Sequence, residues 1–543
     1  MKIHFLGASK VVTGSCYLIN TENYNLLIDC GMFQGSDELE ALNAKAFDFK
    51  PSDIDFVILS HAHIDHSGRI PKLVKEGFKG RIITTKATKE LCDIMLLDSG
   101  HIQESDANWE NKHRLRSGKP LVEPLYTAED ATNSLRYFES ILYDQKIVLN
   151  NEISIRFKDA GHILGSSIVE LWITERNKTA KVVFSGDLGM KNKPIIRNPA
   201  AIDFADYLIM ESTYGNRLHE NVGESLSELV SIINKTVARG GSVIIPSFAV
   251  SRTQELIYEL NRYYEYDKTI DEFMKIPIYI DSPMAVSATG VYKNNAYCFN
   301  DDAKKLIMDG DDPFTFENLF YVRSQEESMR LNEYDYPKVI ISASGMCTAG
   351  RIRHHLRHNL WNKKNSIVFV GYQAEGTLGR QLKDGAKKVK VLGEEVSVEA
   401  EVYSVEGFSG HADKAGLLDF IDHFEAPPKK IFVVHGEENS AEKFAETLRV
   451  KYGVKAIVPD IGFTFELKDH VKTYHEGNQL DIIKNKENIK KELQIVYDQF
   501  ENLANHTDKM IDHHILSTEY DALKNKIIEL QQKLMDLTML LGK

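Results

Sequence analysis

The sequence predicts an α/β protein in which a second α/β domain is inserted into the first, and three observations support this. Short, β-branched apolar runs alternate with helical stretches along most of the chain. Histidine and aspartate follow directly after several of these runs before residue 190, and histidines do so again after residue 400. Between these regions the pattern changes. We therefore expect a first domain at 1–211, an inserted domain at 212–388 and the resumed first domain at 389–466.

Length and composition limit the class of protein. At 543 residues the chain has the length of roughly three or four domains. No apolar run approaches the ~18 residues of a membrane helix, and the N-terminus lacks the layout of a signal peptide, so we expect a cytoplasmic protein with no membrane partner. The five cysteines form no C-x-x-C pair, which argues against a disulfide framework. The charge of −13 argues against a nucleic-acid coat protein but permits a nuclease with a locally basic groove.

The first sixty residues read as short strands separated by tight turns. The apolar runs are Lys2–Leu6, Cys16–Ile19, Leu26–Ile28 and Phe56–Leu59. Asp29 closes the third run. It either orients a metal-binding histidine through a hydrogen bond or is an ordinary turn residue, and the sequence leaves both alternatives open.

A dense group of metal-binding side chains follows the fourth strand. The stretch His61–His66 has the pattern H-x-H-x-D-H. Imidazole suits zinc, and a carboxylate oxygen can hold a second or harder ion. A loop at the end of a buried strand points several ligands at one spot, so we interpret this stretch as a metal site.

Strands and helices alternate after this loop. We expect a helix at 68–76, a strand at 81–84, a helix from Lys86 to about Leu97, and an acid- and amide-rich segment through 120. Strands at 153–159 and 181–184 then lead to His162 and Asp187. Each is a weak signal alone, but the recurrence of such residues after strands, in a chain with H-x-H-x-D-H, predicts that both are ligands.

The pattern changes after Glu211, which ends the strand that begins at Tyr207. In the inserted domain we expect helices at 225–238 and from 253, and strands at 242–246, 278–280, 338–342 and 367–371. The first domain then resumes with strand 400–405, which leads to His411, and strand 430–434, which leads to His435.

The groups at the strand ends form a set of seven: His61, His63, Asp65, His66, His162, Asp187 and His435. Seven ligands are too many for one tetrahedral zinc and suit two metals with one bridging group. Asp187 is the natural bridge, because a carboxylate can give one oxygen to each ion. We expect one metal on His61, His63 and His162, and the other on Asp65, His66 and His435. A water between two dications loses a proton near neutral pH, and the resulting hydroxide can attack phosphorus or a carbonyl. The residues therefore predict a binuclear metallohydrolase.

Several motifs resemble those of a known family. Resemblance to the metallo-β-lactamase fold, an αββα sandwich, rests on His61–His66, His162 and Ser185-Gly186-Asp187. Three further segments resemble the additional motifs of the β-CASP branch of this fold, a branch of nucleic-acid nucleases: Glu211–Gly215, Ser409–Asp413 and Val434–Glu437. A closer similarity, to the nuclease subunit of the pre-mRNA cleavage and polyadenylation specificity factor, rests on Pro246–Leu256, Tyr279–Ala285, Ala343–Met346 and Gly371–Leu378. The likeness covers about residues 1–466, and without an N-terminal KH module the chain is most similar to the KH-less bacterial relatives.

This resemblance implies an activity and the roles of three residues. It implies hydrolysis of phosphodiester bonds in single-stranded RNA with two Zn²⁺ per chain (Mn²⁺ or iron being alternatives), leaving a 5′-phosphate and a 3′-hydroxyl. His411 would be the general acid that protonates the leaving ribose oxygen, Glu211 would hold it, and Asp65 would serve catalysis as well as ligation. The chemistry agrees, because a histidine near dications needs an acidic neighbour to stay protonated. We expect an endonuclease, and a 5′→3′ exonuclease mode is an alternative with identical cutting chemistry.

A basic segment of this acidic chain is a candidate RNA contact. Residues 351–364 carry five fixed positive charges and three histidines but no acid. The segment reads either as a solvated helix face or as a groove that binds phosphates, with Trp361 as a stacking platform. On the second interpretation the contacts include Arg351, Arg353 and Arg357. Further candidates, from loops beside glycines, are Ser344, Arg380 and Ser409.

Two rival functions share the predicted fold. A thioester or lactam hydrolase would use the metal loop but has no use for the inserted domain, Glu211 or His411. A non-cleaving subunit of an RNA-processing complex would have lost metal ligands, whereas all seven are present.

The end of the chain has a different character. Beyond about residue 480 the apolar residues step by four and three, as in heptad seams. Residues 480–543 therefore predict a helical hairpin, which either packs on its own chain or forms a homodimer contact.

Overall fold

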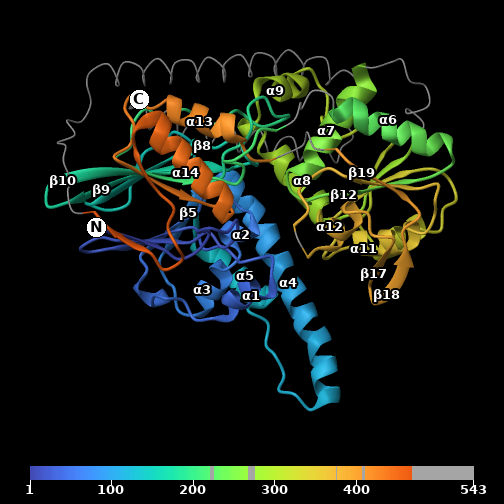
Figure 1. The fold of residues 1–543 in the computed structure, drawn as a ribbon, viewed down its shortest axis with the longest axis horizontal. Coiled ribbons are helices and arrows are strands. Elements are labelled where there is room, and N and C mark those ends of the chain that lie inside the picture. Colours follow the sequence, from blue (N-terminus) through green and yellow to red (C-terminus); the bar gives the residue numbers. More distant parts are fainter. Residues whose placement is uncertain (220–224, 267–275, 375, 406–409, 468–543) are drawn as a thin grey trace, which may run out of the picture. The chain divides into compact units, whose positions relative to one another are not determined.

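The computed structural model describes residues 1–219, 225–266, 276–374, 376–405 and 410–467 (Figure 1). All of the described residues belong to one compact unit. The predicted hairpin and homodimer contact at 480–543 lie outside the described residues, as does Ser409. Within the described ranges, no helix is both long and apolar enough to cross a bilayer. The five cysteines are buried free thiols.

Two seven-stranded sheets form the first domain. In the order β22-β1-β2-β3-β4-β5-β6, the strands of the first sheet are Thr464–Glu466, Lys2–Phe5, Tyr17–Asn20, Asn25–Ile28, Phe56–Ile58, Arg81–Thr85 and Phe138–Ile141. In the order β21-β20-β11-β10-β9-β8-β7, those of the second are Lys455–Ile457, Lys430–Val434, Tyr207–Glu211, Lys178–Phe184, Ser167–Glu175, Ile153–Asp159 and Ile147–Val148.

The two sheets pack face to face with helices outside them. Their inner faces share one apolar core, in which the ring centroids of Phe5 and Phe432 are 5.0 Å apart and those of Tyr17 and Phe184 are 5.4 Å apart. Helices on the outer face of the first sheet are α3 (Ile70–Lys75), α4 (Lys86–Ser117) and α5 (Ala128–Ser134), after the short α1 (Asp37–Glu40) and α2 (Ile64–Ser67). Those on the second sheet are α13 (Lys414–Asp422) and α14 (Glu438–Tyr452). The predicted αββα sandwich is confirmed.

The inserted domain is a parallel sheet with its own helices. In the order β14-β13-β15-β12-β16-β19, its strands are Leu319–Tyr321, Ile278–Ile280, Val339–Ser342, Val243–Pro246, Ser366–Phe369 and Glu401–Ser404. Its helices are α6 (Ser225–Ala238), α7 (Arg252–Tyr266), α8 (Pro283–Asn294), α9 (Asp301–Met308), α10 (Gln325–Leu331), α11 (Ile352–Asn359) and α12 (Leu378–Lys383). A separate hairpin consists of β17 (Lys388–Val391) and β18 (Glu394–Ser397).

The inserted sheet extends further along the chain than the sequence predicts. β19 pairs in parallel with β16, from Ser366 opposite Glu401 to Phe369 opposite Ser404, so it is the edge strand of the inserted sheet. Strand 400–405, which the sequence assigns to the resumed first domain, therefore belongs to the inserted sheet instead, while the domain boundary at 388/389 stays a prediction. The partner of a short strand is set by tertiary packing, which its own sequence does not encode.

Helix α4 is also longer than expected. The sequence predicts an end near Leu97, but the helix has 32 residues and ends at Ser117, with Gly118 in the left-handed conformation at φ 65°. No glycine or proline lies between Gly100 and Gly118 to stop it. Its last buried side chain is Ala107, and beyond this point α4 projects past the neighbouring elements (Figure 1). The acid- and amide-rich composition is that of a solvated helix rather than of a loop.

Candidate metal centre

The predicted metal ligands converge from four strands of the sandwich. His61, His63, Asp65 and His66 follow the C-terminal end of β4. His162 follows β8, Asp187 follows β10 and His435 follows β20. Their ligand atoms form two groups, each spanning no more than 4.8 Å: His61, His63, His162 and Asp187 in one, and Asp65, His66 and His435 in the other. The structure thus brings all seven together in the two predicted sets.

The two oxygens of Asp187 face different groups of histidines. Oδ2 lies 3.4 Å from His61 Nε2 and 3.6 Å from His162 Nε2. Oδ1 lies 3.4 Å from His66 Nε2 and 3.6 Å from His435 Nε2. Two ligand atoms at zinc distance from one tetrahedral ion are about 3.4 Å apart, so these separations suit one ion in each group.

Ring nitrogens in each group face one another at hydrogen-bond distance. His63 Nδ1 lies 3.2 Å from both His61 Nε2 and His162 Nε2, and His66 Nε2 lies 3.0 Å from His435 Nε2. A ring nitrogen carries one proton or one lone pair, so His63 Nδ1 cannot satisfy both neighbours. A cation at the centre of each group would satisfy these atoms.

The charges in the first group agree with metal binding. Burial lowers the pKa of His61 and His162 well below the usual value and that of His63 to about 4. These imidazoles are therefore neutral at pH 7, which is the form that binds a metal. Asp187 Oδ1 is buried and accepts no hydrogen bond within the described part of the chain. The residues fit divalent metal ions.

Asp29 holds His66 from behind. Its Oδ2 lies 2.7 Å from His66 Nδ1 and accepts hydrogen bonds from Ser15 Oγ at 2.9 Å and Ser60 Oγ at 3.0 Å. With Nδ1 directed at Asp29, Nε2 of His66 points toward Asp187. Of the two alternatives for Asp29, this arrangement favours the orienting role.

His411 and Glu211 lie beside the two groups. His411 Nδ1 is 3.2 Å from Glu211 Oε2 and 3.9 Å from Asp187 Oδ2. Glu211 Oε1 is fixed by the backbone N–H of Leu188, which donates to it at 2.6 Å. Burial opposes a positive charge on His411, but Glu211 and Asp187 outweigh this effect and raise its pKa to about 9. Glu211 thus holds the His411 imidazole at Nδ1 and favours its protonated form, which is the form that a general acid needs.

A buried ion pair connects this centre to the inserted domain. Lys193 Nζ donates to the carbonyl oxygen of His162 at 3.1 Å and lies 2.7 Å from Glu255 Oε1 on α7. Ser251 and Arg252 also donate hydrogen bonds to Glu255. The side chains of Lys193 and Glu255 are only 5% and 2% exposed, so the pair is shielded from water.

Comparison with known proteins agrees with this geometry. Residues 10–240 match the Metallo-beta-lactamase superfamily, residues 253–382 match the Beta-Casp domain, and residues 395–459 match the Zn-dependent metallo-hydrolase RNA specificity domain. The chain belongs to the β-CASP branch of the metallo-β-lactamase superfamily. It is a metallo-hydrolase of a ribonuclease family, and the resemblance stated from the motifs is confirmed.

Two curated relatives cover nearly the same part of this β-CASP protein. Ribonuclease TTHA0252 of Thermus thermophilus is 36% identical over 451 residues, which are 83% of this chain and 96% of the relative. Transcription termination factor FttA of Methanocaldococcus jannaschii is 32% identical over 471 residues, which are 84% of this chain and 70% of the relative.

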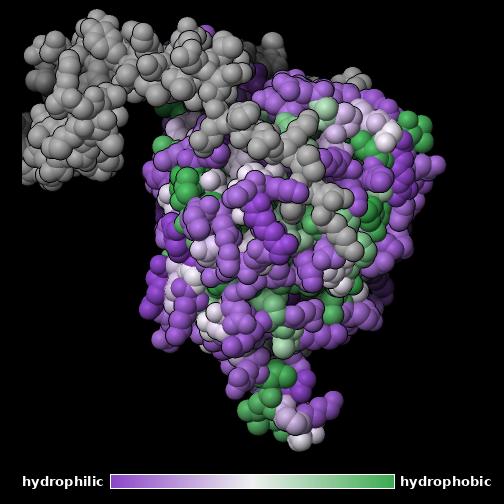
Figure 2. Space-filling model, turned by 90° about the vertical axis from the view of Figure 1, so that its left-hand side faces the viewer, coloured by the Kyte–Doolittle hydropathy of each residue, from purple (hydrophilic) through white to green (hydrophobic). Residues whose placement is uncertain are grey.

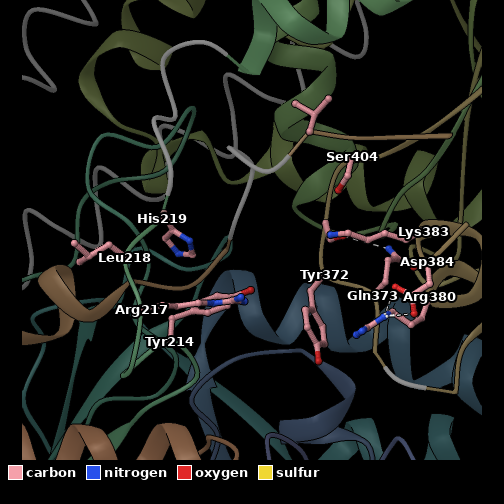
Figure 3. A pocket seen from close by; sticks show the side chains of 12 residues that line it. Tyr214, Arg217, Leu218, His219, Tyr372, Gln373, Arg380, Lys383, Asp384 and Ser404 are labelled. Carbon is pink, nitrogen blue, oxygen red and sulfur yellow. Dashed lines mark hydrogen bonds and ion pairs between the residues drawn. The ribbon is translucent and has the colours of Figure 1, made fainter.

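A cavity of about 380 Å³ opens beside the His411 loop of the β-CASP protein. Figure 3 shows Tyr214 and Arg217 on one side of it, Tyr372 in the middle, and Arg380 with Lys383 on the other side. The Arg217 guanidinium lies 4.5 Å from the centroid of the Tyr214 ring. Another lining residue, His219, contacts the His411 loop, because its Nε2 lies 3.1 Å from the His411 carbonyl oxygen. The cavity thus combines cations and aromatic rings.

The predicted RNA contacts are distributed unevenly around this cavity. Arg380 lines it, with its Nε 2.8 Å from Asp384 Oδ2. Arg351 instead lies 2.6 Å from the buried Asp281, so its charge is already paired. Arg353 and Arg357 lie on the outer side of α11, whose other side packs in the core. Ser344 Oγ accepts the backbone N–H groups of Thr348 and Ala349 within its own loop, at 3.1 Å each.

Sequence reasoning missed several residues that support the site. Thr213 Oγ1 lies 3.2 Å from His435 Nδ1, and the Gly410 carbonyl lies 3.1 Å from His162 Nδ1. Arg217 and Lys193 were also missed. Thr213 stands in the motif after Glu211, and this position was the available signal. Lys193 carried none, because its partner is more than sixty residues away.

Proposed function

We propose that this β-CASP protein is a binuclear zinc ribonuclease that cuts phosphodiester bonds of single-stranded RNA. The products are a 5′-phosphate and a 3′-hydroxyl. The observation that carries the proposal is the placement of Asp187, whose two oxygens each face a separate set of ligands. Two zinc ions, when bound there, supply a water of lowered pKa and positive charge that stabilises a phosphate under attack.

The chain's own residues account for the other parts of the reaction. A water that has lost one proton to solvent forms the new P–O bond, the P–O3′ bond breaks, and His411 delivers its proton to the departing 3′-oxygen. Glu211 holds His411 at Nδ1 and favours its protonated form. Asp65, at 3.4 Å from His435 Nε2, completes the second set of ligands. Asp29 orients His66 for the same set.

RNA binding is supported by the cavity beside His411. Arg217 and Lys383 would bind phosphates next to the scissile bond, and Tyr214 and Tyr372 would stack on bases. Arg380 contributes to the same wall, and Arg353 and Arg357 would extend the path over α11. We exclude Arg351, because its partner Asp281 is fully buried, whereas the acids beside Arg380 and Arg357 are exposed. Free buried cysteines agree with the cytoplasmic location that we propose.

Cleavage of defined RNAs tests this function. The purified zinc-loaded protein is incubated with 5′-labelled and internally labelled single-stranded RNA, and the products are sized. We expect internal fragments with 5′-phosphates from the wild type and almost none from His411→Ala. His423→Ala is the matched control, because His423 is an exposed histidine at the end of α13. Equal activity of both variants, or no cleavage by the metal-loaded wild type, would contradict the proposal.

The same RNAs separate the two modes of cutting. The cations of the cavity would favour a 5′-phosphorylated end only if the chain works as a 5′→3′ exonuclease. An endonuclease should cut RNA with a 5′-hydroxyl equally well and should cut a circular RNA. Release of single nucleotides that requires a 5′-phosphate would establish the exonuclease mode instead.

A further inference from the structure

The free end of α4 has no structural task that accounts for its side chains. Beyond Ala107 the helix buries no residue, and even the large apolar side chain of Trp109 is 66% exposed. A single exposed apolar side chain is ordinary on a protein surface, so Trp109 is informative only together with the residues around it. The tip is nevertheless well formed, because Asn111 bonds to Val122 through both its amide groups and Arg114 Nη1 donates to the Pro120 carbonyl.

One face of this tip is both basic and aromatic. At 100° per residue, Lys112, His113 and Arg116 lie on the same side of the helix as Trp109. The rings of Trp109 and His113 are 4.5 Å apart, so they form a continuous aromatic surface. We call Trp109, Lys112, His113 and Arg116 the α4 tip face.

The tip is basic in an otherwise acidic chain. Residues 109–121 contain four lysines and arginines and one acid, Glu110, which is paired with Arg114 at 2.6 Å. Lys112, Arg116 and Lys119 are exposed and form no ion pair with any of the described residues. Figure 2 shows this end of the molecule protruding, with apolar and hydrophilic side chains mixed on its surface. Asp106, one turn earlier, ends the basic region.

We propose that the α4 tip face is a second contact for single-stranded RNA, distant from the cleavage site. Trp109 stacks on a base, and Lys112 and Arg116 bind the flanking phosphates, the combination by which proteins hold single strands without sequence preference. This inference rests on the proposed ribonuclease function. The role of the α4 tip face is to bind the part of a long RNA that extends away from the metal centre.

The chemistry of the face favours RNA over a protein partner. Protein interfaces also favour tryptophan and arginine, but they concentrate apolar side chains and are depleted in lysine at their centre. Here lysine and arginine flank the one large aromatic side chain. The exposed Leu115 lies about 120° away from Trp109 around the helix and is not part of the face.

The length of the helix gives the size of the RNA that can reach the tip. Thr85 and Thr88, at the start of α4, donate hydrogen bonds to the Gly165 carbonyl in the loop that carries His162. Trp109 is 23 residues beyond Lys86, which places it about 35 Å along the helix. At 3.4 Å per stacked nucleotide, an RNA needs about ten nucleotides to span that distance. A stacked RNA much shorter than this can occupy the metal centre but cannot reach the tip.

RNA-binding measurements on the full chain test this inference. Dissociation constants are measured in the non-cleaving His411→Ala chain for one RNA well above and one well below that length. Trp109→Ala should weaken binding of the long RNA by about tenfold and leave the short RNA unchanged. Lys112→Gln with Arg116→Gln should lower the slope of log affinity against log salt by about 1.4 for the long RNA only.

Two control variants make the result specific. Lys304→Gln with Lys305→Gln, on α9, removes the same charge elsewhere, and Leu115→Ala removes an exposed apolar side chain of the tip outside the face. Neither should alter binding of either RNA. Loss of binding in the charge control equal to that in the tip variant would overturn the inference. So would a Trp109→Ala chain that binds long RNA normally but loses self-association in sedimentation or binding to anionic vesicles.

Failure of the inference differs from failure of the proposed function. If the wild-type chain cleaves no RNA, the ribonuclease function is wrong. The dissociation constants of the tip variants for long and short RNA still decide in that case whether the tip binds RNA. If the wild type cleaves short and long RNA and the tip variants bind both normally, the tip face alone is refuted.

Discussion

Removal of the Lys193 ammonium should destabilise the protein far more than removal of an exposed one. In Lys193→Met, Glu255 stays buried and keeps Arg252 and Ser251 as partners. Breaking a buried pair costs about 3–5 kcal/mol. Because two partners remain, we expect a loss of free energy of unfolding at the lower end, about 3 kcal/mol.

The measurement is a urea titration followed by circular dichroism, after chelation so that lost metal does not contribute. The control is Lys191→Met, whose partner Asp419 is 2.7 Å away while both side chains are more than 40% exposed. Exposed pairs contribute about 0–1 kcal/mol. Glu255→Gln should also cost less in the Lys193→Met chain than in the wild type, because the two residues are in contact. Equal losses in Lys193→Met and Lys191→Met, or strictly additive losses in the double variant, would refute the reasoning.

Three other changes test the centre and its surroundings. Asp187→Ala should lose metal and activity together, since both sets share this carboxylate, and elemental analysis that finds a full metal load would refute the bridge. His411→Ala should keep its metals while the chemical step slows by roughly 10²–10⁴-fold in single-turnover assays; lost metal would make His411 a ligand instead. Burial raises the pKa of Asp159 to about 7 even though Arg197 Nε is 3.1 Å away, so the stability this group contributes is present below about pH 4 and falls as pH rises toward 7. Asp159→Asn should flatten that fall by up to about 1.4 kcal/mol per pH unit in urea titrations between pH 5 and 7, and an unchanged slope would contradict it.

The sequence predicts that the seven candidate ligands converge, and the structure brings them together, because their signal is local. H-x-H-x-D-H puts several ligands within six residues, and His162 and His435 each follow a recognisable buried strand. Parallel strands end at one edge of a sheet, so groups at their ends meet even when hundreds of residues separate them.

The parts that could not be predicted depend on distant partners. The run 351–364 looks uniformly basic, but Arg351 binds Asp281, a buried partner seventy residues earlier in the chain. β19 pairs with β16 in the inserted sheet, and the sequence of its four residues does not reveal this partner. The length of α4 was missed for another reason: solvated helices and loops share the same polar composition, and only the missing glycines and prolines distinguish them.

The pairing of β11 with β20 has a consequence for how this protein is made. Glu211 and Val434 are opposite each other in these neighbouring strands, with the whole inserted domain between them. During synthesis, His61, His63, His162 and Asp187 leave the ribosome long before His435, so a growing chain holds the first ligand group complete and the second without its last histidine. The free energy of closing so long a loop rises only as the logarithm of its length, and an inserted domain that folds early shortens the effective loop further. A nascent chain stopped before β20 should therefore bind one metal ion per chain and gain the second only when β20 is added to the sheet.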